Sequence, residues 1–198
     1  MASAWTTNHV LRIADQPFAK VPLITEFEAR PVLPGIMLWD MWPIQHEDGS
    51  IADINGGSVW MALSAPDHGD PARRHFDARI RLLHRLNDQW HDLGQALPDN
   101  VSPYEREWAG SALLKDDIVS LFTAAGKHET PGGYQQRLFE AHGTLQPDGR
   151  ITEWTATRES VTNCGSHYEM ADQQEGEPGK ITAFRDPAYF RDPEDSQE

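Results

Sequence analysis

Apolar and polar residues alternate along several short segments of this sequence, and each segment is bounded by Gly, Pro, Asn or Asp. A period of two places successive side chains on opposite faces of a β-strand, and no segment sustains the 3.6-residue period of a long helix. The pattern predicts strands at Ser58–Ser64, Ala78–Arg85, Ser111–Leu114, Ile118–Ala124, Gln136–His142 and Ile151–Thr157. We therefore expect an all-β fold.

Turn signals join these strands into hairpins. Lys115-Asp116-Asp117 separates two of them, and Gln146-Pro147-Asp148-Gly149-Arg150 separates another two. Repeated hairpins are typical of a sandwich, a barrel or a propeller, and a spacing of about 40 residues suits propeller blades. The segment 163–180, rich in Gly, Glu, Gln and Ser, is predicted to be a long surface loop.

The carboxy-terminal end indicates an incomplete sheet. Ile181–Phe190 has the pattern of a strand, and Asp192–Ser196 has that of the turn after it, with no returning strand. An unprotected sheet edge is uncommon in native proteins. We expect the chain to be a truncated part of a larger sheet.

Composition narrows the choice of partners and cofactors. With 31 acidic and 17 basic residues the net charge is −14, which disfavours nucleic acid and anionic membrane surfaces. The single Cys164 cannot form an internal disulfide, and no clustered His or Cys supplies a metal site. No apolar run approaches the roughly 18–20 residues that span a bilayer, and Met1–Lys20 lacks the order of a signal peptide.

The densest aromatic stretch is Leu38-Trp39-Asp40-Met41-Trp42-Pro43-Ile44-Gln45, in which a carboxylate lies between indoles. Sugars bind through such groups, because their C–H faces pack on aromatic rings and their hydroxyls hydrogen-bond to carboxylates. A core strand whose Asp caps a turn is the structural alternative.

Three further motifs carry charged or aromatic side chains. Arg185-Asp186-Pro187 follows a strand-like run, although a surface ion pair would explain it and Arg191-Asp192-Pro193 repeats the tripeptide. Arg106-Glu107-Trp108-Ala109-Gly110-Ser111 places an indole before a strand, where a core Trp beside a β-bulge is the alternative. The segment 73–79, with Arg73, Arg74 and His75, is interpreted as an ion-pair cluster in a loop.

Taken in order, these motifs resemble the levansucrases, inulosucrases and related β-fructofuranosidases of glycoside hydrolase family 68. Trp39-Asp40-Met41-Trp42-Pro43-Ile44-Gln45 is similar to the family's Trp-Asp-x-Trp-Pro-Leu-Gln segment, and Val59–Leu63 and Ala78-Arg79-Ile80 follow in the same order. Glu107-Trp108-Ala109-Gly110-Ser111 corresponds to Glu-Trp-Ser-Gly-Ser, and Phe184-Arg185-Asp186-Pro187 matches the Arg-Asp-Pro motif.

The resemblance implies that residues 1–198 are the amino-terminal part, about two blades, of one catalytic five-bladed β-propeller domain. It implies that Asp40 is the nucleophile, that Asp186 stabilises the transition state, and that Trp39, Trp108, Ala109 and Arg185 form the donor site. Ala109 stands where many relatives have a Ser that would hydrogen-bond near the nucleophile. The family's general acid is a Glu in the later half of the enzyme, beyond residue 198.

The implied reaction is a retaining double displacement on sucrose, with water or a growing fructan as acceptor and without a metal or organic cofactor. We expect a levansucrase, with a hydrolase or inulosucrase of the same family as the alternative. The resemblance implies an extracellular enzyme, although a cytoplasmic one stays open because no signal peptide is visible.

Two other classes of protein remain open. A non-catalytic carbohydrate-binding module would use Trp39, Trp42 and Trp108 as stacking platforms. A lectin-like or structural β protein without a sugar site would use Asp40 for stability alone.

Overall fold

The computed structural model describes residues 6–14, 22–25, 27–130, 133–162 and 184–192. The chain divides into two compact units, residues 1–31 and 32–198. The first contains helix α1 (Thr7–Ala14), which the hydrophobic pattern did not predict, and a turn in which the backbone N–H of Thr25 donates to Glu28. None of the helices among the described residues is both long and apolar enough to cross a membrane.

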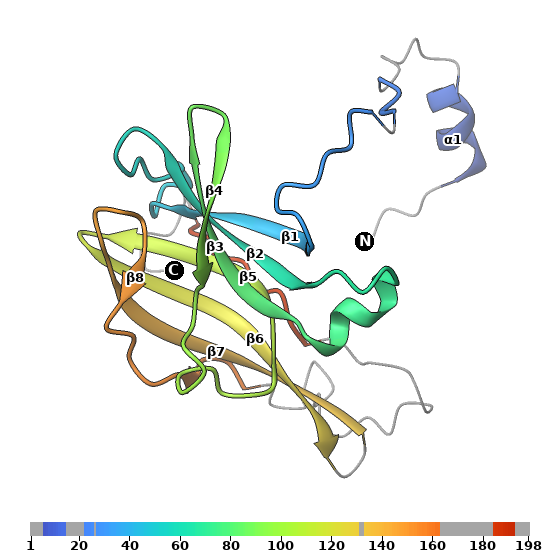
Figure 1. Cartoon of the computed structure of the whole chain (residues 1–198). Coiled ribbons are helices and arrows are strands. Elements are labelled where there is room, and N and C mark those ends of the chain that lie inside the picture. The colour runs from blue at the N-terminus through green and yellow to red at the C-terminus, as the bar shows by residue number, and fades with distance from the viewer. Residues whose placement is uncertain (1–5, 15–21, 26, 131–132, 163–183, 193–198) are drawn as a thin grey trace. The chain divides into compact units, whose positions relative to one another are not determined.

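The second unit consists of two antiparallel meanders (Figure 1). The first meander has the order β4-β3-β2-β1, and the second has the order β5-β6-β7-β8, with β9 also pairing with β7. The first is built from β1 (Ile36–Gln45), β2 (Ser58–Pro66), β3 (Arg79–Leu86) and β4 (Gln89–Gln95), with the 3-10 helix η1 (Pro71–Phe76) between β2 and β3. The second is built from β5 (Arg106–Lys115), β6 (Ile118–Thr130), β7 (Gly133–Leu145), β8 (Ile151–Thr152) and β9 (Arg158–Glu159).

The two meanders meet at a parallel pairing of their first strands, where Ile44 of β1 lies opposite Ala112 of β5. The core contains side chains from both meanders, among them Ile44, Met61, Ile80 and Leu121, none of which is accessible to solvent. Full burial of such a side chain stabilises a fold by about 1.5–3 kcal/mol. The shared core fixes how β1 and β5 lie against each other.

Most of the predicted strands are confirmed, and both predicted turns join strands: 115–117 between β5 and β6, and 146–150 between β7 and β8. The prediction for 151–157 was too long, because the strand ends at Thr152 and Glu153 adopts a left-handed backbone with φ of 54°. The predicted strand 181–190 is wrong over its described part, since residues 184–192 form no strand. Asp186 has φ of 59° there, and Pro187 has no N–H to donate. Cys164 and the predicted loop 163–180 lie outside the described residues.

Candidate functional site

A β-bulge in β1 positions Asp40. Trp39 lies opposite Leu63 of β2 and Met41 lies opposite Ala62, so that Asp40 has no partner in the ladder. Its φ of 45° is left-handed, a conformation that Asp adopts more readily than most residues. The bulge thus places an exposed carboxylate beside the partly buried indole of Trp39.

A second irregularity positions Trp108. The register between β5 and β6 shifts between Glu107 and Gly110, and the hydroxyl of Thr123 donates to the carbonyl of Trp108 at 2.5 Å. Gly110 is required there, because a Cβ on it would lie 1.9 Å from the carbonyl oxygen of Phe122. The indole is 2% exposed and belongs to the core, as the structural alternative for this motif anticipated.

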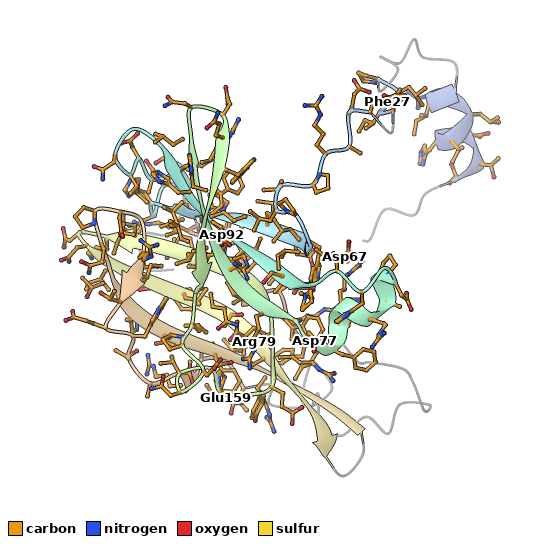
Figure 2. All side chains as sticks on the ribbon, viewed as in Figure 1. Phe27, Asp67, Asp77, Arg79, Asp92 and Glu159 are labelled. Carbon is orange, nitrogen blue, oxygen red and sulfur yellow. The ribbon has the colours of Figure 1, made fainter. Side chains whose placement is uncertain are left out.

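A buried carboxylate anchors the start of β5. Glu107 is 1% exposed, and its side chain accepts hydrogen bonds from the backbone N–H of Ile80 at 2.6 Å and from Arg79 at 3.2 Å. Figure 2 shows Arg79 and Asp77 where the chain leaves η1 and enters β3. Burial raises the pKa of Glu107 although these donors oppose the shift. The contacts tie β3 to β5 directly beside Trp108.

The segment 184–192 brings Arg185 and Asp186 to the same place. The Arg185 guanidinium lies over the Trp108 ring, 5.2 Å from its centroid, and its Nε is 3.3 Å from a carboxylate oxygen of Asp186. The second tripeptide behaves differently, because Arg191 pairs with Glu47 at 2.9 Å. The structure therefore distinguishes the two Arg-Asp-Pro tripeptides, which look the same in the sequence: only the first lies at the Trp108 ring.

The charge of Asp40 acts on Asp186. The pKa of Asp186 is raised chiefly by burial; Arg185 lowers it, and the negative charge of Asp40 raises it. Both carboxylates stand on left-handed backbone, with φ of 45° and 59°. Backbone in this region is costly and is concentrated at functional sites.

His75 is a member of this cluster that the sequence analysis missed. Its ring lies 6.2 Å from that of Trp39 and 5.8 Å from that of Trp108, measured between centroids, and Arg74 lies 5.4 Å over Trp39. The ion-pair interpretation of segment 73–79 fits Arg79, which pairs with Glu107, whereas Arg74 and His75 contact the aromatic rings. The sequence did not place Arg74 and His75 beside Trp39, because only the folded chain brings η1 close to β1.

Two remaining aromatic and small residues have defined places. Trp42 is 8% exposed and packs in the core, so it offers no open stacking face. Ala109 is partly buried against the same core and has no side-chain group that could hydrogen-bond. The hypothesis of a binding module needs three exposed Trp platforms. Trp42 and Trp108 are both buried, so neither offers a ring face for stacking in this module.

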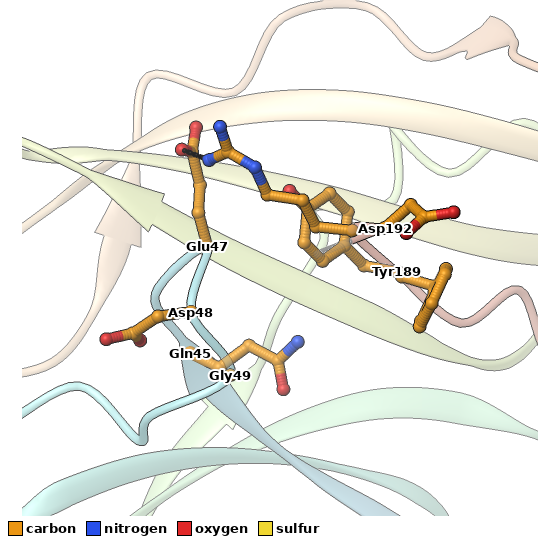
Figure 3. Close-up of a pocket in the computed structure, with 8 residues that line it drawn as sticks. Gln45, Glu47, Asp48, Gly49, Tyr189 and Asp192 are labelled. Atoms are coloured by element: carbon orange, nitrogen blue, oxygen red, sulfur yellow. Dashed lines mark hydrogen bonds and ion pairs between the residues drawn. The ribbon is translucent and has the colours of Figure 1, made fainter. Parts of the chain in front are cut away.

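The surface pocket in Figure 3 is separate from this cluster. It has a volume of about 470 Å³ and is lined by residues 45 and 47–49 and by 189–192. The Arg191–Glu47 ion pair on its wall is drawn as a dashed line.

Across the part of the chain that the structure describes, no group of three His, Cys, Asp or Glu side chains could hold a metal ion.

Comparisons with known proteins identify the family. A family model described as Levansucrase/Invertase, that of glycoside hydrolase family 68, matches residues 1–198. The levansucrase LscC of Pseudomonas savastanoi pv. glycinea is 26% identical and covers 98% of this chain, with 48% of the relative matched. The levansucrase of Erwinia amylovora is 25% identical, with 98% of this chain and 49% of the relative covered. The chain spans about half the length of the curated relatives it matches.

Solved structures show the same fold. An inulosucrase from Halalkalicoccus jeotgali bound to kestose has a TM-score of 0.74 and 34% identity over 88% of this chain and 44% of that one. Bacillus subtilis levansucrase has a TM-score of 0.73 and 22% identity over 88% and 43%. The predicted fold class, all-β and part of a five-bladed propeller, is confirmed by this likeness. With its family model matched over residues 1–198, the chain belongs to the levansucrase/invertase family, glycoside hydrolase family 68.

Proposed function

We propose that this chain is the amino-terminal part of a catalytic propeller domain that cleaves sucrose and transfers its fructosyl unit. One observation carries the proposal: the negative charge of Asp40 on β1 acts on Asp186, a carboxylate from a distant segment that pairs with Arg185 over the Trp108 indole. A reaction with a positively charged, oxocarbenium-like transition state needs such an arrangement.

Asp40 is the nucleophile in this mechanism. Its carboxylate oxygen bonds to the anomeric carbon of the fructosyl unit as the glycosidic bond breaks, and glucose leaves with a proton from a carboxylic acid. Water or the hydroxyl of a fructan then displaces Asp40, which restores the carboxylate. Since attack occurs twice, the configuration is retained.

The neighbouring groups assist this step through charge and shape. Asp186 stabilises the positive charge that develops on the ring, and Arg185 restrains Asp186 through the contact at 3.3 Å. Trp39, Trp108 and Ala109 form the wall of the donor site, with a methyl group at Ala109 where many relatives carry a hydroxyl. No metal or organic cofactor takes part in this mechanism.

The relatives favour a levansucrase. The curated relatives named above are levansucrases, which supports this assignment, whereas the inulosucrase structure bound to kestose supports only a sugar as the substrate. A β-fructofuranosidase or an inulosucrase of the same family is the alternative outcome, differing in the acceptor. The proposed partners are sucrose and a fructan acceptor, without nucleic acid or membrane, and the proposed location is outside the cell.

The test uses a fructosyl donor whose leaving group departs without protonation by a general acid. The 198-residue chain is incubated with fructosyl fluoride, whose fluoride leaves without protonation, and peptides are analysed by mass spectrometry. We expect one fructosyl unit esterified to Asp40. Asp40→Asn should abolish the adduct and Asp186→Asn should slow its formation by about 10²-fold or more, a loss typical of a transition-state group.

The matched control is Asp192→Asn, which alters the second Arg-Asp-Pro tripeptide and should form the adduct at the normal rate. An adduct on another residue, or none on Asp40, would contradict the proposed nucleophile. Sugar binding without any adduct would favour the non-catalytic alternative.

A further inference from the structure

His75 occupies a central position in the cluster. Its imidazole contacts Trp39 of β1 edge-on, with 78° between the ring planes, and Trp108 of β5 at 42°. Both indoles belong to segments with a shifted register, one of which carries Asp40. A residue of η1 therefore contacts one indole on the strand that carries Asp40 and a second indole on the strand that pairs with it.

The ring nitrogens of His75 are available to a ligand. Within the described part of the chain, neither ring nitrogen has a hydrogen-bond partner, and the side chain is only partly buried. A neutral imidazole has one N–H donor and one acceptor nitrogen, which is the pair of functions that a sugar hydroxyl complements. The aromatic contacts use the faces and edges of the rings and leave these nitrogens free.

Burial and the surrounding charges favour the neutral form of this imidazole. Burial lowers the pKa of His75, and Arg74 of η1, Arg185 of segment 184–192 and Arg106 of β5 lower it further. Asp40 of β1 opposes them. His75 therefore stays uncharged near neutral pH and does not neutralise the carboxylate of Asp40 by pairing with it.

We propose that His75 is a further substrate-recognition residue, which hydrogen-bonds a hydroxyl of the sugar unit on which Asp40 acts while it spaces the indoles of Trp39 and Trp108. The inference rests on the proposed function and extends it to a residue outside the motifs. In this role the neutral His75 imidazole offers one hydrogen-bond donor and one acceptor while it packs against two indoles.

Two variants at this position distinguish the hydrogen-bonding role of the ring nitrogens from the packing role of the aromatic ring. His75→Phe keeps an aromatic ring between the indoles but removes both nitrogens, whereas His75→Gln keeps a donor and an acceptor but removes the ring. Sucrose is titrated into the 198-residue chain at pH 7.5 and the intrinsic Trp fluorescence is followed, because Trp39 and Trp108 adjoin the site. Thermal unfolding by circular dichroism shows whether each variant is folded.

We expect His75→Phe to weaken sucrose binding by about three- to tenfold, the effect of one hydrogen bond, and His75→Gln to restore at least half of that loss. The affinity of the unsubstituted chain should fall as the pH is lowered from 7.5 to 5.5, because the imidazolium loses its acceptor and pairs with Asp40. His75→Gln should lack this dependence, which a purely structural role would not produce.

Unchanged affinity in folded His75→Phe would overturn the inference and leave the proposed function standing, as would a pH dependence that persists in His75→Gln. Failure of the unsubstituted chain to bind sucrose, together with absence of the Asp40 adduct, would overturn both.

Discussion

The side-chain oxygen of Gln136 accepts a hydrogen bond of 2.9 Å from the backbone N–H of Phe184, the residue immediately before Arg185 and Asp186. Gln136 lies on β7 and is fully buried. Strand β7 thus holds the segment that carries a candidate catalytic carboxylate, although none of its described side chains, at 136–145, belongs to the cluster itself.

Gln136→Leu should therefore loosen segment 184–192. Leu has a similar volume but no acceptor, and the loss of one hydrogen bond of about 1 kcal/mol should raise the rate of trypsin cleavage after Arg185 about fivefold. Gln89→Leu, on the exposed start of β4, is the matched control and should leave this cleavage unchanged. Equal cleavage in both variants would show that Gln136 does not hold the segment.

The pKa of Asp186 should respond in opposite directions to its two charged neighbours. Asp40→Asn removes a negative charge and should lower this pKa, whereas Arg185→Gln removes a positive charge and should raise it. Carboxyl ¹³C chemical shifts followed from pH 2.5 to 7 measure both changes. Movement in the same direction in the two variants would mean that changed burial, and not charge, controls this group.

The pH dependence of stability should reflect Glu107. Because its pKa is raised in the folded chain above its ordinary value of 4.5, the folded state holds this proton more tightly than the unfolded state. The resulting stabilisation is fully present below pH 4.5 and is lost as the pH rises through the raised pKa. The free energy of unfolding of the unsubstituted chain relative to Glu107→Gln should thus be greatest near pH 4 and decrease toward pH 8 in urea titrations. An increase with pH would mean that the Arg79 contact outweighs burial.

Gly110→Ala should be strongly destabilising. The added Cβ would meet the backbone carbonyl of Phe122, which cannot turn away as a side chain would, and we expect a loss of about 3 kcal/mol in the free energy of unfolding. Gly56→Ala is the control, since it meets no atom within 4 Å and bears only the cost of a left-handed φ, about 1–2 kcal/mol. Similar losses at the two sites would contradict the close packing of β5 against β6.

Regular alternation in the sequence predicted the strands whose one face is buried. Strand β3 is an example, with Ile80 and Leu82 in the core and Arg79 and Arg81 partly exposed. Strand β4 was missed because Gln89–Gln95 is largely polar and partly exposed, so that its pairing with β3 comes from backbone hydrogen bonds and not from a buried face. Strand β1 was not among the predicted strands, since the bulge at Asp40 and the presence of Pro43 interrupt its pattern.

The candidate site was predictable only where it coincided with a motif. Asp40, Arg185 and Asp186 stand in segments that resemble the family, and the structure brings them together. His75 and Gln136 have no such signal. Their positions depend on how η1 and β7 pack against segments 36 and 48 residues away along the chain, and a local pattern does not encode contacts at that distance.

The joint between the two meanders, which is the parallel pairing of β1 with β5, should form late in folding. Their parallel pairing rests on Ile44 with Ala112 and Gln45 with Leu113, residues 68 positions apart, whereas neighbouring strands within each meander follow one another along the chain. Closing a long loop costs more entropy than closing a short one, so each meander should form first and the joint last. Substitutions at Ile44 or Ala112 should then act mainly on the unfolding rate, and the geometry of the candidate site would be completed only in the final step of folding.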